Sequence, residues 1–168
     1  NKDIMLCAKA SLNPGENYEG DEGRPNEFHP KKSKECWGSR DQDPAPTAGE
    51  WTYASYAPNA WIMNTREGSW GRDLDAKFWG KAESVTMPYL VPLFLDSRWV
   101  DVWPMETDYP NDAEHGGQGG QGSMQQLCHT RHGKTTNIVY CDGSAGRVKL
   151  TELWGQKWHR KYNTTNDV

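Results

Sequence analysis

His132 and Asp142 are the two side chains of this 168-residue chain best suited to exchange a proton. Nine residues separate them and Gly143 follows, so the stretch has the form H-x9-DG. A histidine titrates near neutral pH and a carboxylate can orient it, as general acid–base catalysis requires. Catalysis also needs a nucleophile or metal and a concave pocket, for which the sequence has no motif. We therefore favour a structural pair, in which His132 bonds to backbone or to Asp142 and holds its loop against a hairpin.

Two groups of residues offer ligands for a metal ion. Imidazoles together with Asp142 would suit zinc, although no Cys-x-x-Cys or His-Glu-x-x-His spacing supports such a site. Oxygen ligands concentrated in one loop would suit calcium, but their spacing matches no EF-hand, and solvated acidic loops are common. We expect no cofactor and keep calcium as the candidate. The histidines are His115, His129, His132 and His159, and the calcium candidates are Asp108, Asn111, Asp112 and Glu114.

A β-hairpin is expected to carry the H-x9-DG stretch. Strand-forming residues occupy 137–141 and 145–150, with Asp142-Gly143 between them. This dipeptide is a strong hairpin signal because Gly accepts the positive φ of a tight turn. Asp142 should then accept amide hydrogen bonds within the turn. A helical start is expected at Thr151.

An apolar segment is expected to join this hairpin in a small antiparallel sheet, and an aromatic segment is expected to pack nearby. Residues 51–56 alternate aromatic and small side chains, which predicts a strand with one buried face. The apolar run 90–96 predicts a buried strand of about five residues. Residues 70–79 predict one or two helical turns, with Phe78 and Trp79 docked inward. The expected fold class is α+β.

Composition limits the class of protein. The formal net charge is −4 without a basic block, which argues against a nucleic-acid partner. The chain contains 17 Gly and 10 Pro, which favour turns and short strands over long helices. We expect one domain over 1–168, with long surface loops at 13–46 and 104–124. No run approaches the roughly 18 apolar residues of a membrane span, so we expect no membrane span and no signal peptide within this chain.

The order of these motifs resembles one known family. H-x9-DG is followed by a strand, a Leu153-Trp154 pair and a Lys157-Trp158-His159 pattern, and the run 90–96 ends in Asp. This combination is similar to the prepilin-type H-x9-DG proteins, relatives of type IV pilins and type II secretion pseudopilins. The resemblance covers nearly the whole chain and is specific at 90–96 and 131–160. One departure is Ala8, where family members commonly have Pro after the first Cys.

The resemblance implies a pilin-like globular head whose apolar N-terminal helix lies outside this chain or comes from another chain. It implies an extracellular or cell-surface structural subunit, not an enzyme, that assembles with identical or related subunits. A secreted carbohydrate-binding module remains the main alternative because the chain has nine Trp, and a metal-dependent hydrolase remains the second. The residues to which the resemblance assigns motif or structural roles are Arg131, His132, Asp142, Gly143, Trp154 and Trp158.

Export would also bear on the cysteines and on glycosylation. Four cysteines in a loop-rich exported chain suggest two disulfides, with three possible connectivities. One connectivity pairs Cys7 with Cys36 and Cys128 with Cys141, and the alternative is a set of buried thiols. Asn163 begins an Asn-x-Thr pattern, which is a candidate glycosylation acceptor.

Overall fold

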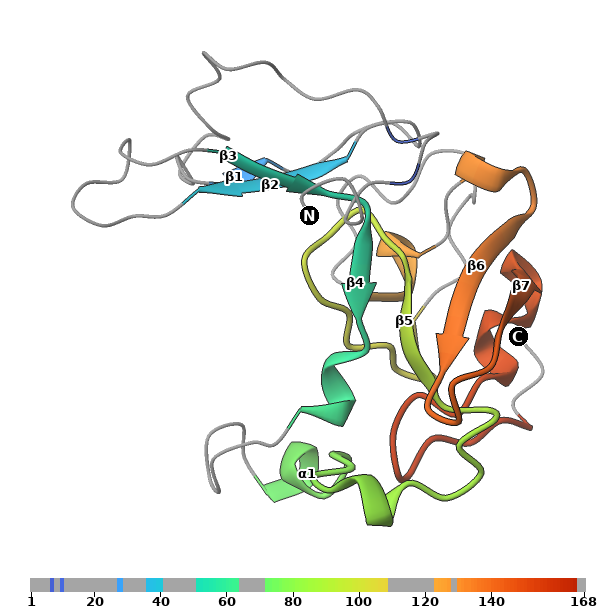
Figure 1. The fold of residues 1–168 in the computed structure, drawn as a ribbon. Coiled ribbons are helices and arrows are strands. Elements are labelled where there is room, and N and C mark those ends of the chain that lie inside the picture. Colours follow the sequence, from blue (N-terminus) through green and yellow to red (C-terminus); the bar gives the residue numbers. More distant parts are fainter. Residues whose placement is uncertain are drawn as a thin grey trace.

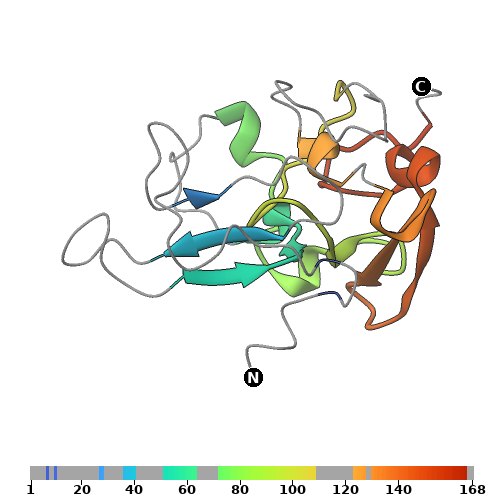
Figure 2. The same cartoon turned by 90° about the horizontal axis from the view of Figure 1, so that it is seen from above.

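The computed structural model describes residues 7, 10, 27–28, 36–40, 51–63, 72–108, 123–127 and 130–165 (Figure 1). Within these residues the chain forms two antiparallel sheets, which Figures 1 and 2 show from two directions. The first sheet has the order β1-β2-β3 and the second the order β4-β5-β6-β7. Their strands are β1 (Glu27–Phe28), β2 (Trp37–Arg40), β3 (Trp51–Ala54), β4 (Tyr56–Pro58), β5 (Pro92–Asp96), β6 (Thr135–Tyr140) and β7 (Ala145–Lys149).

The four-stranded sheet confirms the expected small antiparallel sheet, and with few helices the fold is α+β or mostly β. Strand β5 falls within the predicted run 90–96, and β6 and β7 form the predicted hairpin. Strand β6 begins at Thr135, two residues before the predicted start, because Thr135 and Thr136 pair with Lys149 and Val148.

The three-stranded sheet was not predicted, and it corrects two expectations. The segment 51–56 is not one strand: the chain leaves β3 at Ser55 and enters β4 of the other sheet. The segment 13–46 is not only a loop, because it contains β1 and β2. Trp37 pairs with Ala54 and Arg40 with Trp51. Hydrogen bonds to β3 therefore order a stretch whose composition predicts no regular secondary structure.

The helical segments are short. They are α1 (Arg72–Asp75) and the 3-10 helices η2 (Ala60–Ile62), η3 (Ala82–Ser84), η4 (Ser123–Gln126), η5 (Thr130–His132) and η6 (Leu150–Gly155). Phe78 and Trp79 follow α1 and are buried, as predicted. The predicted surface loop 104–124 extends too far at its C-terminal end, because Met124 is fully buried in η4. Residues 109–122 lie outside the described ones.

The inner face of the four-stranded sheet carries the main core. Ala57, Leu95 and Ile138 form a cross-strand row, since Ala57 pairs with Leu95 and Leu95 with Ile138, and all three are buried. Alternate residues of a strand point to opposite faces. The C-terminal segment packs on this face and contributes the apolar side chains of Leu150, Leu153, Trp154, Trp158 and Tyr162.

Trp158 and Asn59 connect this C-terminal segment to the sheet. The Trp158 indole donates to the Leu153 carbonyl at 2.8 Å, and the Trp158 carbonyl accepts from Asn59 Nδ2 at 2.9 Å. Asn59 Nδ2 also donates to the Pro92 carbonyl at 2.9 Å. Trp154 is buried and its indole donates to the Asp108 carbonyl. Both motif tryptophans therefore lie in the core.

The outer face of the same sheet is only partly covered. The next row along the strands is Pro58, Phe94, Val139 and Ala145, paired in that order across the four strands. These apolar residues are half-buried or exposed. They border a groove of about 550 Å³ lined by Tyr56, Phe94, Leu95, Asn137, Ile138, Val139, Ala145 and Gly146. Among the described residues, no helix is long and apolar enough to cross a membrane.

Candidate functional site

His132 and Asp142 lie at opposite ends of β6, so the alternative in which His132 bonds to Asp142 is wrong. His132 ends η5 just before the strand, and Asp142 begins the turn after it. Asp142 is exposed and its Oδ1 accepts hydrogen bonds from the Ser144 amide at 2.9 Å and the Ser144 hydroxyl at 2.6 Å. Both bonds lower the pKa of Asp142. Gly143 has φ +85°, so the predicted role of Asp-Gly in the turn is confirmed.

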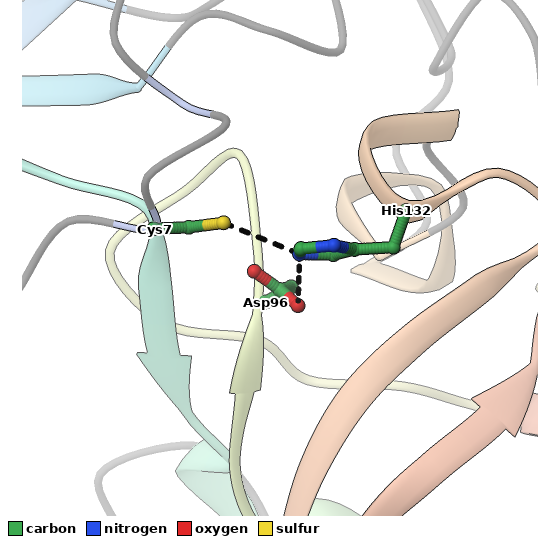
Figure 3. Close-up of side chains that lie close together, drawn as sticks. All are labelled: Cys7, Asp96 and His132. Carbon is green, nitrogen blue, oxygen red and sulfur yellow. Dashed lines mark hydrogen bonds and ion pairs between the residues drawn. The ribbon is translucent and has the colours of Figure 1, made fainter.

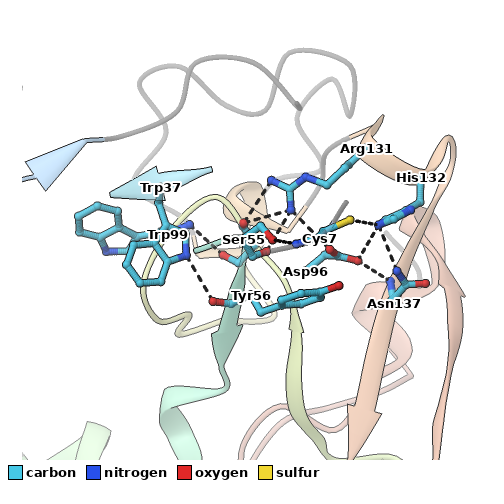
Figure 4. Close-up of polar contacts among 10 residues, drawn as sticks. Cys7, Trp37, Ser55, Tyr56, Asp96, Trp99, Arg131, His132 and Asn137 are labelled. Atoms are coloured by element: carbon cyan, nitrogen blue, oxygen red, sulfur yellow. Dashed lines mark hydrogen bonds and ion pairs between the residues drawn. The ribbon is translucent and has the colours of Figure 1, made fainter. Parts of the chain in front are cut away.

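The carboxylate beside His132 is that of Asp96, at the end of β5. His132 Nε2 lies 3.2 Å from Asp96 Oδ2 (Figures 3 and 4). The Asn137 amide donates to the same Oδ2 at 3.1 Å. The side chain of Asp96 is fully buried, whereas that of His132 is 12% exposed. Pairing of β5 with β6 brings Asp96 to the start of β6, where η5 presents His132.

Arg131 supplies the counter-charge for this buried carboxylate. Its NH1 lies 3.4 Å from Asp96 Oδ1, with both side chains fully buried. NH1 also donates to the Ser55 carbonyl at 3.0 Å and to the Ser97 carbonyl at 3.4 Å. Burial lowers the pKa of Arg131, and the charge of Asp96 opposes that change. Arg131 thus links the start of β4 to the end of β5 (Figure 4).

Cys7 completes a compact cluster with these groups. Its Sγ lies 3.2 Å from His132 Nε2 (Figure 3), and the Cys7 amide donates to Ser55 Oγ at 2.6 Å. The ligand atoms of Cys7, Asp96 and His132 all lie within 4.8 Å of one another. The Tyr56 hydroxyl also bonds to Cys7. Burial raises the pKa of Tyr56 to about 12, with the charges of Asp96 and Cys7 adding to the rise.

The geometry differs from that of a cysteine–histidine–aspartate nucleophile. In such a triad the carboxylate holds one ring nitrogen and the nucleophile approaches the other. Here Asp96 and Cys7 both contact Nε2 of His132, so the carboxylate does not orient the ring for proton transfer from sulfur. What the arrangement can do is tie the segment at Cys7, the end of β5 and the start of β6 together, or hold a cation.

The cysteines are thiols in the structure, so the disulfide expectation is corrected for the described ones. Cys7, Cys36 and Cys141 carry no disulfide. Cys7 and Cys36 nevertheless share a small buried cluster with Ala10, flanked by Tyr53 and Tyr56. The sulfur of Cys7 faces His132, which gives it a polar partner other than Cys36. Cys128 lies outside the described residues.

The calcium prediction can be compared with the structure at only one of its four residues. Asp108 is described, and its Oδ2 accepts from the amides of Met105 at 3.2 Å and Met124 at 2.9 Å. Burial raises the pKa of Asp108, although these two bonds oppose the rise. This oxygen therefore joins two chain segments by itself. Asn111, Asp112 and Glu114 lie outside the described residues, so the calcium site stays a prediction.

The histidine site considered as an alternative from the sequence does not form among the described residues. His159 is fully buried between the rings of Trp61 and Tyr162, at centroid distances of 5.2 Å and 5.1 Å. Its Nε2 lies 3.3 Å from Glu106 Oε2 without hydrogen-bond alignment. Burial lowers the pKa of His159 to about 4, although Glu106 opposes the change. His115 and His129 lie outside the described part of the chain.

The remaining candidates are the glycosylation acceptor and the tryptophans of the carbohydrate-binding alternative. Asn163 is exposed, and its Oδ1 accepts from the Thr165 amide and hydroxyl, so its glycosylation stays a prediction. Half-buried Trp99 and Trp103 are the least covered of the tryptophans whose side chains are described. The other five are buried, and they are Trp37, Trp61, Trp79, Trp154 and Trp158.

Sequence reasoning missed Cys7, Asp96 and Asn137 as partners of His132. One signal was available for Asp96: it directly ends an apolar run, and a carboxylate that is buried there needs a partner. Asn137 lies five positions after His132, but only the turn into β6 places its Nδ2 3.1 Å from Nε2. For Cys7 there was no local signal.

Comparisons of the chain with models of protein families, with curated proteins and with solved structures found no match.

Proposed function

We propose that this chain is the globular head of a structural subunit in an extracellular type IV pilus-like filament or type II secretion pseudopilus. Its partners would be identical or related subunits and an apolar N-terminal helix, covalently attached or supplied by another chain. The observation that carries the proposal is the half-covered apolar face of the four-stranded sheet. A soluble head with no partner would gain stability by covering such a face.

The groove on this face has the right location for an N-terminal helix. The apolar row Pro58, Phe94, Val139 and Ala145 runs across all four strands beside it. Tyr56 lines one end of the groove and bonds to Cys7. Cys7 therefore lies beside a residue that lines the groove, and the proposed helix would precede Cys7 in the sequence. The resemblance of the H-x9-DG and C-terminal motifs implies the same helix on the same kind of sheet.

The roles of the motif residues also favour a structural subunit. Arg131 and His132 connect to Asp96 inside the fold, and Asp142 and Gly143 form an exposed turn. Trp158 is fully buried. None of these five residues needs a substrate to explain its place. The buried tryptophans do not favour the carbohydrate-binding alternative, since a sugar platform requires exposed rings.

Electron microscopy of the full-length protein from its native source tests the proposal. The full-length protein should form regular filaments with a helical core. Val139→Asp, which places a charge in the groove, should abolish them while the head keeps its thermal unfolding transition. Val100→Asp is the matched control, because Val100 is 40% exposed and lies outside the groove. Dispersed monomers in the native material, or filaments unaffected by Val139→Asp, would contradict the proposal.

A further inference from the structure

We propose that Cys7, Asp96 and His132 form a mononuclear zinc site that clamps three distant parts of the chain. The three ligand atoms are a sulfur, an imidazole nitrogen and a carboxylate oxygen, a set that borderline cations such as zinc favour. Cys7 is 6% exposed and Asp96 is fully buried, so the cluster is largely closed to solvent. The inference is independent of the filament proposal.

The first argument is that His132 Nε2 has more close polar neighbours than it can hydrogen-bond at one time. Cys7 Sγ and Asp96 Oδ2 each lie 3.2 Å away, and Asn137 Nδ2 lies 3.1 Å away. A ring nitrogen carries either one hydrogen or one lone pair. With a hydrogen, it faces the Asn137 donor; with a lone pair, it faces the Asp96 acceptor. A cation between the sulfur, nitrogen and oxygen removes the conflict of Nε2 with Asp96 and Cys7, because all three atoms then direct a lone pair at it.

The second argument is the spacing of the ligand atoms. Zinc bonds of about 2.3 Å to sulfur and about 2.0–2.1 Å to nitrogen and oxygen, at tetrahedral angles, place ligand atoms roughly 3.3–3.6 Å apart. The two separations from Nε2 are 3.2 Å each. These two separations fit zinc within a few tenths of an ångström, and the third, between Cys7 Sγ and the Asp96 carboxylate, is at most 4.8 Å. Three protein ligands leave the fourth position to water.

The surrounding residues are arranged to support such a site. Arg131 holds the other oxygen of Asp96, Oδ1, so that Oδ2 faces His132. Its guanidinium charge is shared with the Ser55 and Ser97 carbonyls. The Tyr56 side chain hydrogen-bonds to Cys7 and so contacts the proposed sulfur ligand from outside the ligand set. Outer partners of this kind orient metal ligands and tune their basicity.

Cobalt(II) titration of the chelator-treated, reduced 168-residue chain tests the site. One equivalent of cobalt should produce a thiolate-to-cobalt charge-transfer band, which zinc then displaces. Cys7→Ser should lose the band, whereas Cys36→Ser should keep it, because Cys36 is buried in the same cluster but is not a ligand. His132→Gln should weaken zinc binding by more than the roughly 10–100-fold cost of losing an outer partner.

Three results would overturn the zinc site without bearing on the filament proposal. They are the absence of a charge-transfer band in the unmodified chain, a band that survives Cys7→Ser, and a Cys7–Cys36 disulfide in native protein isolated without reductant. The last outcome, read by mass spectrometry of non-reduced peptides, would instead restore the disulfide that the sequence suggests. Because the first and last tests use the unmodified chain, they stand even if a variant fails to fold.

Discussion

Replacing Asp96 by alanine should be among the most destabilising single changes in this chain. The Asp96 carboxylate contacts Arg131 at 3.4 Å and His132 at 3.2 Å, and it accepts the Asn137 amide at 3.1 Å. Removing one partner of a buried ion pair costs about 3–5 kcal/mol, because the remaining charge is left without compensation. We expect a loss of about 4 kcal/mol, which is about a thousandfold in the unfolding equilibrium constant.

Urea denaturation of the whole chain, with a chelator present so that no metal contributes, measures this loss. Asp142→Ala is the control: its carboxylate is exposed and bonds only to Ser144 among the contacts described, so its loss should be far smaller. The double variant Asp96→Leu/Arg131→Met removes both charges and should recover much of the stability. If Asp96→Ala costs no more than Asp142→Ala, the buried network does not hold the sheet together. Asp96→Asn, which preserves shape, gives the same comparison if the alanine variant does not fold.

Two further predictions concern single residues. Gly143→Ala should destabilise the chain by about 1–2 kcal/mol in urea denaturation, because φ is +85° there. No atom obstructs the new Cβ at either Gly143 or Gly155, and Gly155 has no positive φ, so Gly155→Ala should be close to neutral. Equal losses of stability in the two variants would contradict the turn argument. Lowering the pH from 7 to 5 should reduce the free energy of unfolding by about 2 kcal/mol through His159. The pKa of His159 is about 4 in the folded state and 6.5 is expected on unfolding. Between these two values protons therefore bind preferentially to the unfolded chain. His159→Phe should remove that part of the pH dependence, and an unchanged stability difference between pH 7 and 5 in this variant would contradict it. The depressed pKa of Glu106 acts below its ordinary value of 4.5, outside this window.

Local sequence was sufficient where a conformation depends on neighbouring residues. The Asp142-Gly143 turn could be predicted because only the backbone freedom of Gly and the short reach of an Asp side chain are involved. Strand β5 and the inward docking of Phe78 and Trp79 followed from short apolar runs bounded by prolines and polar residues. The division of segment 51–56 at Ser55 could not be predicted, since aromatic and small residues alternate on both sides of it. Only strand pairing decides which sheet each half joins.

The candidate site required the tertiary structure. The sequence singled out His132 and suggested Asp142 as its carboxylate, because H-x9-DG places them in one motif. A six-residue strand, Thr135–Tyr140, keeps the two apart, and antiparallel pairing of β5 with β6 brings in Asp96 instead. Cys7 lies 125 residues from His132 along the chain, yet their side chains are in contact. Residue type and spacing determined which groups could do chemistry and how the turn beside them folds. The order and register of the strands decided which groups meet, because contacts over such separations depend on how the whole sheet assembles.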